Sequence, residues 1–217
     1  VGLEAVAITD HVHRDGPEGW VGSDRFPAYA AALEEAARAA PLRVVSGAEC
    51  VILDSAGRVS IDPGQAERLE FVLADLGRRT AGVGDGSASS SGRLVRHALE
   101  ASIRVCALPY IHGLAHPLNL GRFEPAATLE EITDAQLEEL GDAMTEGGKR
   151  FDVMNQMSHW FPSYSVERLT GEYARVLSVL AGRGVQFVLG SDAHSAGAVG
   201  NLAWSRRVLA AAGISMA

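Results

Sequence analysis

The sequence predicts an α/β protein in which a parallel sheet is covered by helices, and it favours a barrel over an open doubly wound sheet. Short apolar segments alternate with amphipathic helical segments along the whole chain, the order expected of parallel strands joined by helical crossovers. These apolar segments have no polar alternation, which is typical of strands buried on both faces. Several of them end in side chains that bind metal ions. All strands of a barrel end at one rim, whereas an open sheet gathers ligands at one switch point, so this distribution favours the barrel.

Size and charge limit the class of protein. The chain has 217 residues, of which 47% are hydrophobic, and we treat residues 1–217 as a single domain with ample capacity for a core. A net charge of −8 argues against a broad surface for nucleic acid or anionic membranes. No apolar run approaches the ~20 residues of a membrane-spanning helix. With only Cys50 and Cys106 there is no disulfide framework, so we expect a cytoplasmic protein.

The first part of the chain predicts a strand, a loop, a helix and a second strand. Residues 3–9 are apolar and partly β-branched, as in a buried strand. A loop rich in Gly, Pro and Asp is expected at residues 14–24. Residues 26–40 place apolar side chains on one helical face and end at a proline. Residues 42–46 form the next expected strand, which runs into Glu49.

The middle of the chain predicts a turn, two strands and a helix. An Asp-Ser-Ala-Gly turn at residues 54–57 indicates a hairpin. Residues 69–74 are expected to form a third core strand, and the Gly- and Ser-rich residues 81–92 a loop. We expect a helix over residues 93–102, followed by a strand over residues 103–108.

The last part of the chain predicts three helices and two strands. Thr128 and the glutamate three residues later form a capping-box pattern, which predicts the start of a long acidic helix. Residues 151–155 and 185–190 are expected to be strands. Residues 165–181 and, roughly, 199–212 are expected to be helices that end at glycines.

Metal-ligand side chains follow at least four predicted strands. They are Asp10 and His11, Glu49, His116, and the pair Asp192 and His194. If the last segment stays extended, the side chains of Asp192 and His194 point the same way. Considered alone, this segment could equally be a loop with a capping Asp and an exposed His. Histidines and carboxylates without thiolates suit Zn, Mn or Fe in a hydrolytic site better than a structural zinc. Ions sharing a carboxylate would activate water and clamp a phosphate ester, so phosphoester hydrolysis fits best.

Other polar residues are candidates for the substrate side of such a site. Arg122 follows His116 by six residues and is either a phosphate clamp or a surface residue. His13 and His159 lie past predicted strands and are either pocket residues or ordinary loop residues. His97 and His112 are interpreted as structural.

Five segments, taken in order, resemble motifs of the PHP (polymerase and histidinol phosphatase) family, and the end of the chain is most similar to its histidinol-phosphatase-like branch. They are Thr9-Asp10-His11, Gly47-Ala48-Glu49, Leu114-Ala115-His116-Pro117, Asp152-Val153-Met154-Asn155 and Gly190-Ser191-Asp192-Ala193-His194. The resemblance implies a distorted, TIM-like (β/α)7 barrel with two or three divalent ions (Zn, Mn or Fe). It also implies hydrolysis of a small phosphorylated metabolite, similar to histidinol phosphate, by metal-bound hydroxide.

The resemblance also implies residue roles. The implied metal ligands are His11, Glu49, His116, Asp192 and His194, with Glu49 as the bridging carboxylate. Asp192 and His194 would also be catalytic. Asn155 matches a position that lines the site.

Two features depart from the family pattern and keep other functions open. The opening His-x-His of the first strand is not in the chain, and we expect that strand upstream of Val1. Gly77 stands where the family has a ligand histidine. One alternative is therefore a catalytically weak PHP domain that serves as a structural or binding module. Another is a metal-barrel hydrolase that cleaves C–N bonds. The sequence does not indicate an oligomeric state.

Overall fold

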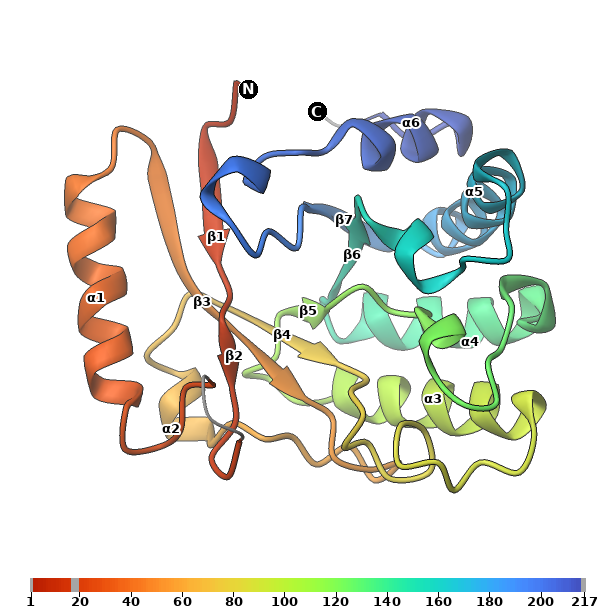
Figure 1. Ribbon diagram of the computed structural model, residues 1–217, viewed down its shortest axis with the longest axis horizontal. Coiled ribbons are helices and arrows are strands. Elements are labelled where there is room, and N and C mark those ends of the chain that lie inside the picture. The colour runs from red at the N-terminus through yellow and green to blue at the C-terminus, as the bar shows by residue number, and fades with distance from the viewer. Residues whose placement is uncertain (1, 17–19, 216–217) are drawn as a thin grey trace.

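A computed structural model describes residues 2–16 and 20–215, so the predicted loop at 14–24 lies partly outside the described residues. The strands form one curled parallel sheet in the order β1-β3-β4-β5-β6-β7, with β2 continuing from β1 and pairing with β3 (Figure 1). The strands are β1 (Ala5–Ile8), β2 (His11–Val12), β3 (Arg43–Val51), β4 (Phe71–Asp75), β5 (Gly113–Leu114), β6 (Arg150–Met154) and β7 (Gln186–Gly190). The predicted α/β class and parallel sheet are therefore confirmed.

Helices cover the outside of this sheet. They are α1 (Phe26–Ala39), α2 (Pro63–Ala66), α3 (Ser91–Cys106), α4 (Asp134–Glu146), α5 (Val166–Gly182) and α6 (Ala203–Ala211), with 3-10 turns η1 (Leu120–Arg122), η2 (Leu129–Glu131), η3 (Met157–Trp160) and η4 (Ala196–Ala198). Helix α1 packs on β3, and α3, α4, α5 and α6 pack in succession, each on the next (Figure 1). None of the helices in the described part of the chain is long and apolar enough to cross a membrane.

The sheet is a half-barrel with two edges. Strands β1 and β7 each pair on one side only within the described residues, so the curl does not close between them. Strands β4 and β6 are almost wholly buried, whereas β1 and β7 are partly exposed. This is a distorted relative of the TIM barrel, in which strand carboxyl ends still converge on one rim.

The expected strand over residues 103–108 is wrong, because α3 continues to Cys106. Leu94, Ala98, Ala101 and Val105 are all buried and recur at helical spacing. Val105 therefore continues the buried face of α3. The packing of this face outweighs the β preference of the short run of β-branched residues from residue 103. The strand of this region is instead the two-residue β5, Gly113–Leu114.

The long helix expected from Thr128 begins later. Thr128 does form a capping box with Glu131, but this box caps only the short turn η2. A second capping box follows at once, in which the Thr133 hydroxyl accepts a hydrogen bond from the amide of Gln136 and begins α4. Similarly, the last helix begins at Ala203 rather than near residue 199. The expected hairpin near residues 54–57 is reduced to one antiparallel bridge between Ile52 and Val59.

Candidate metal centre

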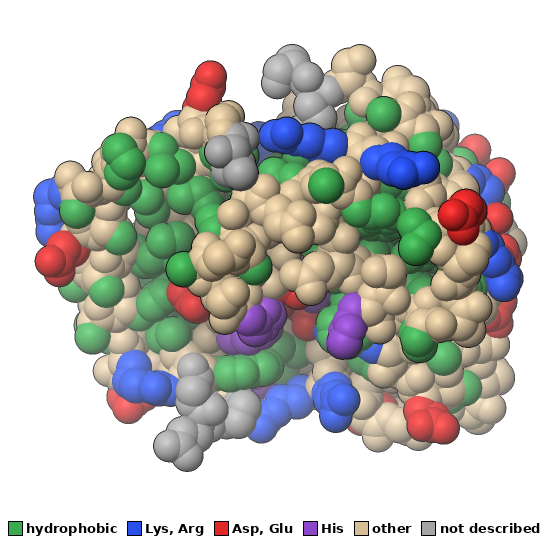
Figure 2. All heavy atoms as spheres, turned by 45° about the horizontal axis from the view of Figure 1, so that its top comes forward, with side chains coloured by type: hydrophobic (Ala, Val, Ile, Leu, Met, Phe, Trp, Pro, Cys, Tyr) green, Lys and Arg blue, Asp and Glu red, His purple; other side chains and the backbone are tan. Residues whose placement is uncertain are grey.

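Glu49 stands between two imidazoles at the carboxyl ends of the strands. His11 on β2 lies directly opposite Glu49 on β3 in the parallel register, which brings His11 Nδ1 to 3.4 Å from Glu49 Oε1. His116 follows β5, and its Nε2 lies 3.5 Å from the same oxygen. The expectation that different strand ends bring His11, Glu49 and His116 together is met by the fold. Figure 2 shows histidine side chains on either side of a hollow in one face, with acidic side chains inside it.

Asp75, the last residue of β4, completes a buried cluster with Glu49 and His116. One ligand atom from each of these three residues lies within 4.8 Å of the others. Asp75 Oδ1 is 3.4 Å from His116 Nδ1. All three residues are at most 7% exposed. Two carboxylates and an imidazole at this spacing are a donor set that suits a divalent cation.

The charges in this cluster strongly perturb one another. Burial alone would lower the pKa of His116, but the carboxylates of Glu49 and Asp75 outweigh it and raise that pKa to about 10. Burial opposes ionisation of Glu49, yet the positive His116 beside it holds the pKa of Glu49 below its usual value. Burial raises the pKa of Asp75. Such perturbed groups in one cleft are characteristic of functional sites.

A third buried carboxylate, Asp152 on β6, is hydrogen-bonded to the backbone of His116. Its Oδ2 accepts a hydrogen bond from the backbone amide of His116 at 3.0 Å. His116 has a positive φ of 29°, so this bond holds a sparsely populated backbone conformation at the site. Burial raises the pKa of Asp152 to about 6. A Cβ at Gly190 would lie only 2.2 Å from Asp152 Oδ1, so glycine on β7 leaves room for this carboxylate.

Two buried carboxylate oxygens at the cluster accept no hydrogen bond within the described part of the chain, as expected if a cation binds there. Glu49 Oε1 and Asp152 Oδ1 are fully buried and accept no hydrogen bond from the described residues. An unpaired buried acceptor costs free energy unless an ion or water satisfies it. The residues present therefore fit a divalent metal ion.

Asp192 and His194 lie together but outside this buried cluster. Strand β7 ends at Gly190, and Asp192 adopts a left-handed φ of 46°, so the extended geometry assumed for this segment is wrong. Among the described residues, Asp192 and His194 form an ion pair with each other, in which His194 Nδ1 lies 3.8 Å from Asp192 Oδ1. The His194 side chain is 78% exposed. The negative charge of Asp192 nonetheless contributes to the raised pKa of Asp152, which places Asp192 near the cluster.

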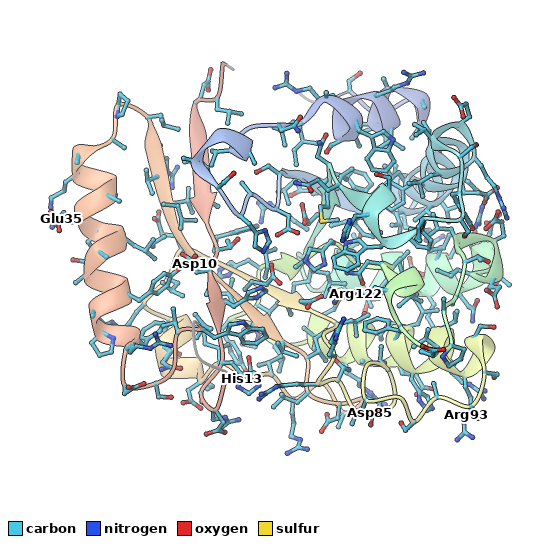
Figure 3. All side chains as sticks on the ribbon, in the orientation of Figure 1. Asp10, His13, Glu35, Asp85, Arg93 and Arg122 are labelled. Carbon is cyan, nitrogen blue, oxygen red and sulfur yellow. The ribbon has the colours of Figure 1, made fainter. Side chains whose placement is uncertain are left out.

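Arg122, the candidate phosphate clamp, is held inside the site. Its Nη2 lies 2.7 Å from Asp75 Oδ1 and also donates to the Leu76 carbonyl. The guanidinium lies 5.0 Å from the ring centroid of Phe123 and 4.9 Å from that of Trp160. It is therefore a fixed cation with a side chain only 14% exposed, not a surface residue. Figure 3 labels Arg122, which belongs to η1 beyond β5.

The other candidate substrate residues have more local contacts. His13 lies just beyond β2 (Figure 3), is buried, and accepts a hydrogen bond from the Asp15 amide through Nδ1. The side-chain oxygen of Asn155 accepts from the amides of Trp204 and Ser205 and so anchors the start of α6. His159 is exposed on η3 and packs edge-on against Trp160.

The two histidines interpreted as structural have local partners. His112 accepts a hydrogen bond from the Val72 amide at 3.0 Å, which ties the start of β5 to β4. His97 lies on α3, where its Nδ1 contacts the Gly82 carbonyl. Neither belongs to the buried cluster.

Asp75 and Asp152 are the functional residues that sequence reasoning missed. Asp75 directly follows the predicted strand over residues 69–74 and is the last residue of β4, whereas Asp152 lies within β6. The available signal was a carboxylate in an otherwise apolar buried strand, which has to be paired or bound to a cation.

Comparisons with known proteins agree with this architecture. No protein-family model matches the chain. A probable phosphatase from Caldicellulosiruptor bescii is 27% identical over 193 residues, which cover 89% of this chain and 68% of that protein.

Two solved structures share the fold. One is the histidinol phosphate phosphatase of Lactococcus lactis, complexed with zinc, L-histidinol and phosphate. It superposes with a TM-score of 0.68 and 16% identity over 99% of this chain and 84% of that chain. The other is a putative histidinol phosphatase from Listeria monocytogenes, with a TM-score of 0.64 and 10% identity over 92% of this chain and 87% of that chain. The resemblance found in the sequence is thus confirmed at the level of the fold: the chain has the α/β half-barrel fold of the PHP-type histidinol phosphatases.

Proposed function

We propose that this protein is a metal-dependent phosphoesterase that hydrolyses a small phosphorylated metabolite. The observation that carries the proposal is the buried carboxylate of Glu49. Its Oε1 accepts no hydrogen bond from the described residues and lies between the imidazoles of His11 and His116. The phosphatase names of the sequence relative and of both structural neighbours support the same reaction class.

In this proposal the chain's own residues hold the ions and orient the substrate. His11, Glu49 and His116 would hold the ions, and Asp192 and His194 would complete the set from the segment that follows β7. Bound divalent ions would lower the pKa of a water molecule towards ~7 and neutralise phosphate oxygens. Zinc is the ion in the Lactococcus neighbour, and zinc, manganese and iron all suit this donor set.

Four further residues are proposed to line the substrate side. Arg122 contributes a fixed positive charge next to the cluster, which favours a phosphate group. His13, Asn155 and His159 lie beyond the ends of β2 and β6. The Lactococcus neighbour binds histidinol and phosphate, so we include a histidinol-phosphate-like compound among the candidate substrates.

Metal removal and reloading test the reaction class. We expect protein treated with a chelator to lose hydrolysis of phosphomonoesters and to regain it with Zn²⁺ or Mn²⁺. A parallel assay on amides separates phosphoester from C–N hydrolysis. A reloaded protein that is inert towards phosphoesters would instead favour a binding module, and one that cleaves only amides would favour the other hydrolase class.

Binding of the first ion is expected to release a proton. The pKa of about 10 means that His116 is protonated at pH 7 in the metal-free protein, whereas a ligand imidazole must be neutral. The apparent metal affinity should therefore rise about tenfold per pH unit below that pKa. Calorimetry in two buffers of different ionisation enthalpy measures the release, with about one proton expected for the first ion. His97→Gln is the matched control outside the site and should not change this number, and absence of release would contradict a role for His116 as ligand.

A further inference from the structure

The two buried carboxylates of the cluster approach different nitrogens of His116. Glu49 Oε1 lies nearest Nε2, at 3.5 Å, and Asp75 Oδ1 lies nearest Nδ1, at 3.4 Å. The side-chain nitrogen of Asn119 also lies 2.9 Å from Nδ1, and with this amide turned over its oxygen, which otherwise has no hydrogen-bond partner in the described part of the chain, accepts from Nδ1–H. Two protein groups therefore lie at Nδ1, whereas the Glu49 oxygen at Nε2 accepts no hydrogen bond from the described residues.

Arg122 gives Asp75 a permanent counter-charge. The oxygen of Asp75 that lies near His116 is the one that accepts from Arg122 Nη2 at 2.7 Å. The guanidinium is held in place by the Leu76 carbonyl and by the rings of Phe123 and Trp160. An arginine cannot shed its proton, so a divalent ion on Asp75 would face a fixed positive charge at close range.

We infer that Asp75, held by Arg122, is a positioning residue that fixes the His116 ring from Nδ1, and that it is not itself a metal ligand. Ligand histidines commonly have a carboxylate on the nitrogen that does not face the metal, which sets their tautomer and orientation. With the remaining proton held on Nδ1 after metal binding, the lone pair of Nε2 is available to an ion on the Glu49 side. The inference rests on the proposed metal site, and it means that the β4 strand contributes no ligand although Asp75 lies within 4.8 Å of the other donors.

Replacement of Asp75 by Asn separates a positioning role from a ligand role. An asparagine keeps a carbonyl at Nδ1, so we expect Asp75→Asn to bind as many ions as wild type, with affinity weakened 10- to 100-fold, the loss typical of a positioning partner. The absorption spectrum of the Co²⁺-substituted protein should keep its band positions, because the ligands do not change. Ion number is measured by elemental analysis after equilibrium dialysis.

Two controls bracket this result. Asp54→Asn removes a carboxylate paired with an arginine away from the site and should change neither affinity nor spectrum. Glu49→Gln removes a proposed ligand and should lower the ion number. Loss of an ion, or a shifted Co²⁺ spectrum, in Asp75→Asn would overturn the inference, and so would an unchanged affinity.

A second variant covers the case in which Asp75→Asn does not fold. Arg122→Gln removes the fixed positive charge and leaves Asp75 free to bind an ion, so we expect this variant to gain an ion or to shift the Co²⁺ spectrum. An unchanged ion number and spectrum would indicate that Asp75 is already a ligand in the wild type. A wild-type protein that binds no more metal than Glu49→Gln would overturn both the inference and the proposed function, whereas a failure confined to Asp75 would leave the proposed function intact.

Discussion

Glu49→Gln is expected to remove bound divalent ions and to reduce phosphoester hydrolysis more than ~100-fold. Partners that only orient a ligand already contribute 10- to 100-fold, so loss of a proposed ligand itself should exceed that range. Glutamine is similar in size but carries no charge to hold a cation between His11 and His116. The measurement is metal content by elemental analysis together with the rate on a phosphomonoester.

A surface carboxylate provides the matched control for this variant. Glu35 is exposed on α1 (Figure 3), and Glu35→Gln should keep metal content and rate at wild-type values. Circular dichroism on both variants verifies folding. A folded Glu49→Gln protein with full metal content and activity would refute the role assigned to this carboxylate.

Arg122→Met is expected to lower the free energy of unfolding of the metal-free protein by about 3 kcal/mol or more. The substitution removes the guanidinium from the buried Asp75 and leaves only His116 as a cation beside it, and breaking a buried pair typically costs that much. For a chain of this size the loss corresponds to a fall in Tm of roughly 6–12 °C. Thermal unfolding followed by circular dichroism measures it.

The control for this variant is an exposed pair with similar chemistry. Arg168 pairs with Glu130 and lies 4.2 Å from the ring centroid of Tyr164, but its side chain is 54% exposed. Arg168→Met should therefore cost less than about 1 kcal/mol. The double variant Arg122→Met with Asp75→Asn should recover part of the loss, because it removes the stranded charge. Equal small effects of Arg122→Met and Arg168→Met would contradict the buried pair.

The parts of the site that follow predicted strands could be foreseen from the sequence, although the structure places Glu49 within β3 and His11 at the start of β2. Uniformly apolar segments identify buried parallel strands, and the parallel arrangement brings their carboxyl ends together whatever the connections are. That argument alone joins His11, Glu49 and His116, and the structure places them around one oxygen.

Other parts depended on tertiary contacts that the sequence does not display. Asp75 ends β4 and Asp152 lies inside β6, and only the curl of the sheet shows that they face the same interior as Glu49. An aspartate can adopt the left-handed backbone conformation found at Asp192 but does not require it. The alternation of side chains along a strand therefore could not predict where β7 ends. Whether the run from Ile103 continues a helix or starts a strand was likewise decided by packing of the α3 stripe.

The most direct test of the metal centre is anomalous diffraction from crystals of the zinc-loaded protein. The account predicts a zinc peak about 2.0–2.2 Å from a Glu49 oxygen and from His116 Nε2, with Asp75 still paired to Arg122 and outside ligand distance. A peak bound to Asp75 with Arg122 displaced would contradict the positioning role of that pair, and absence of zinc between Glu49 and His116 would contradict the metal centre itself.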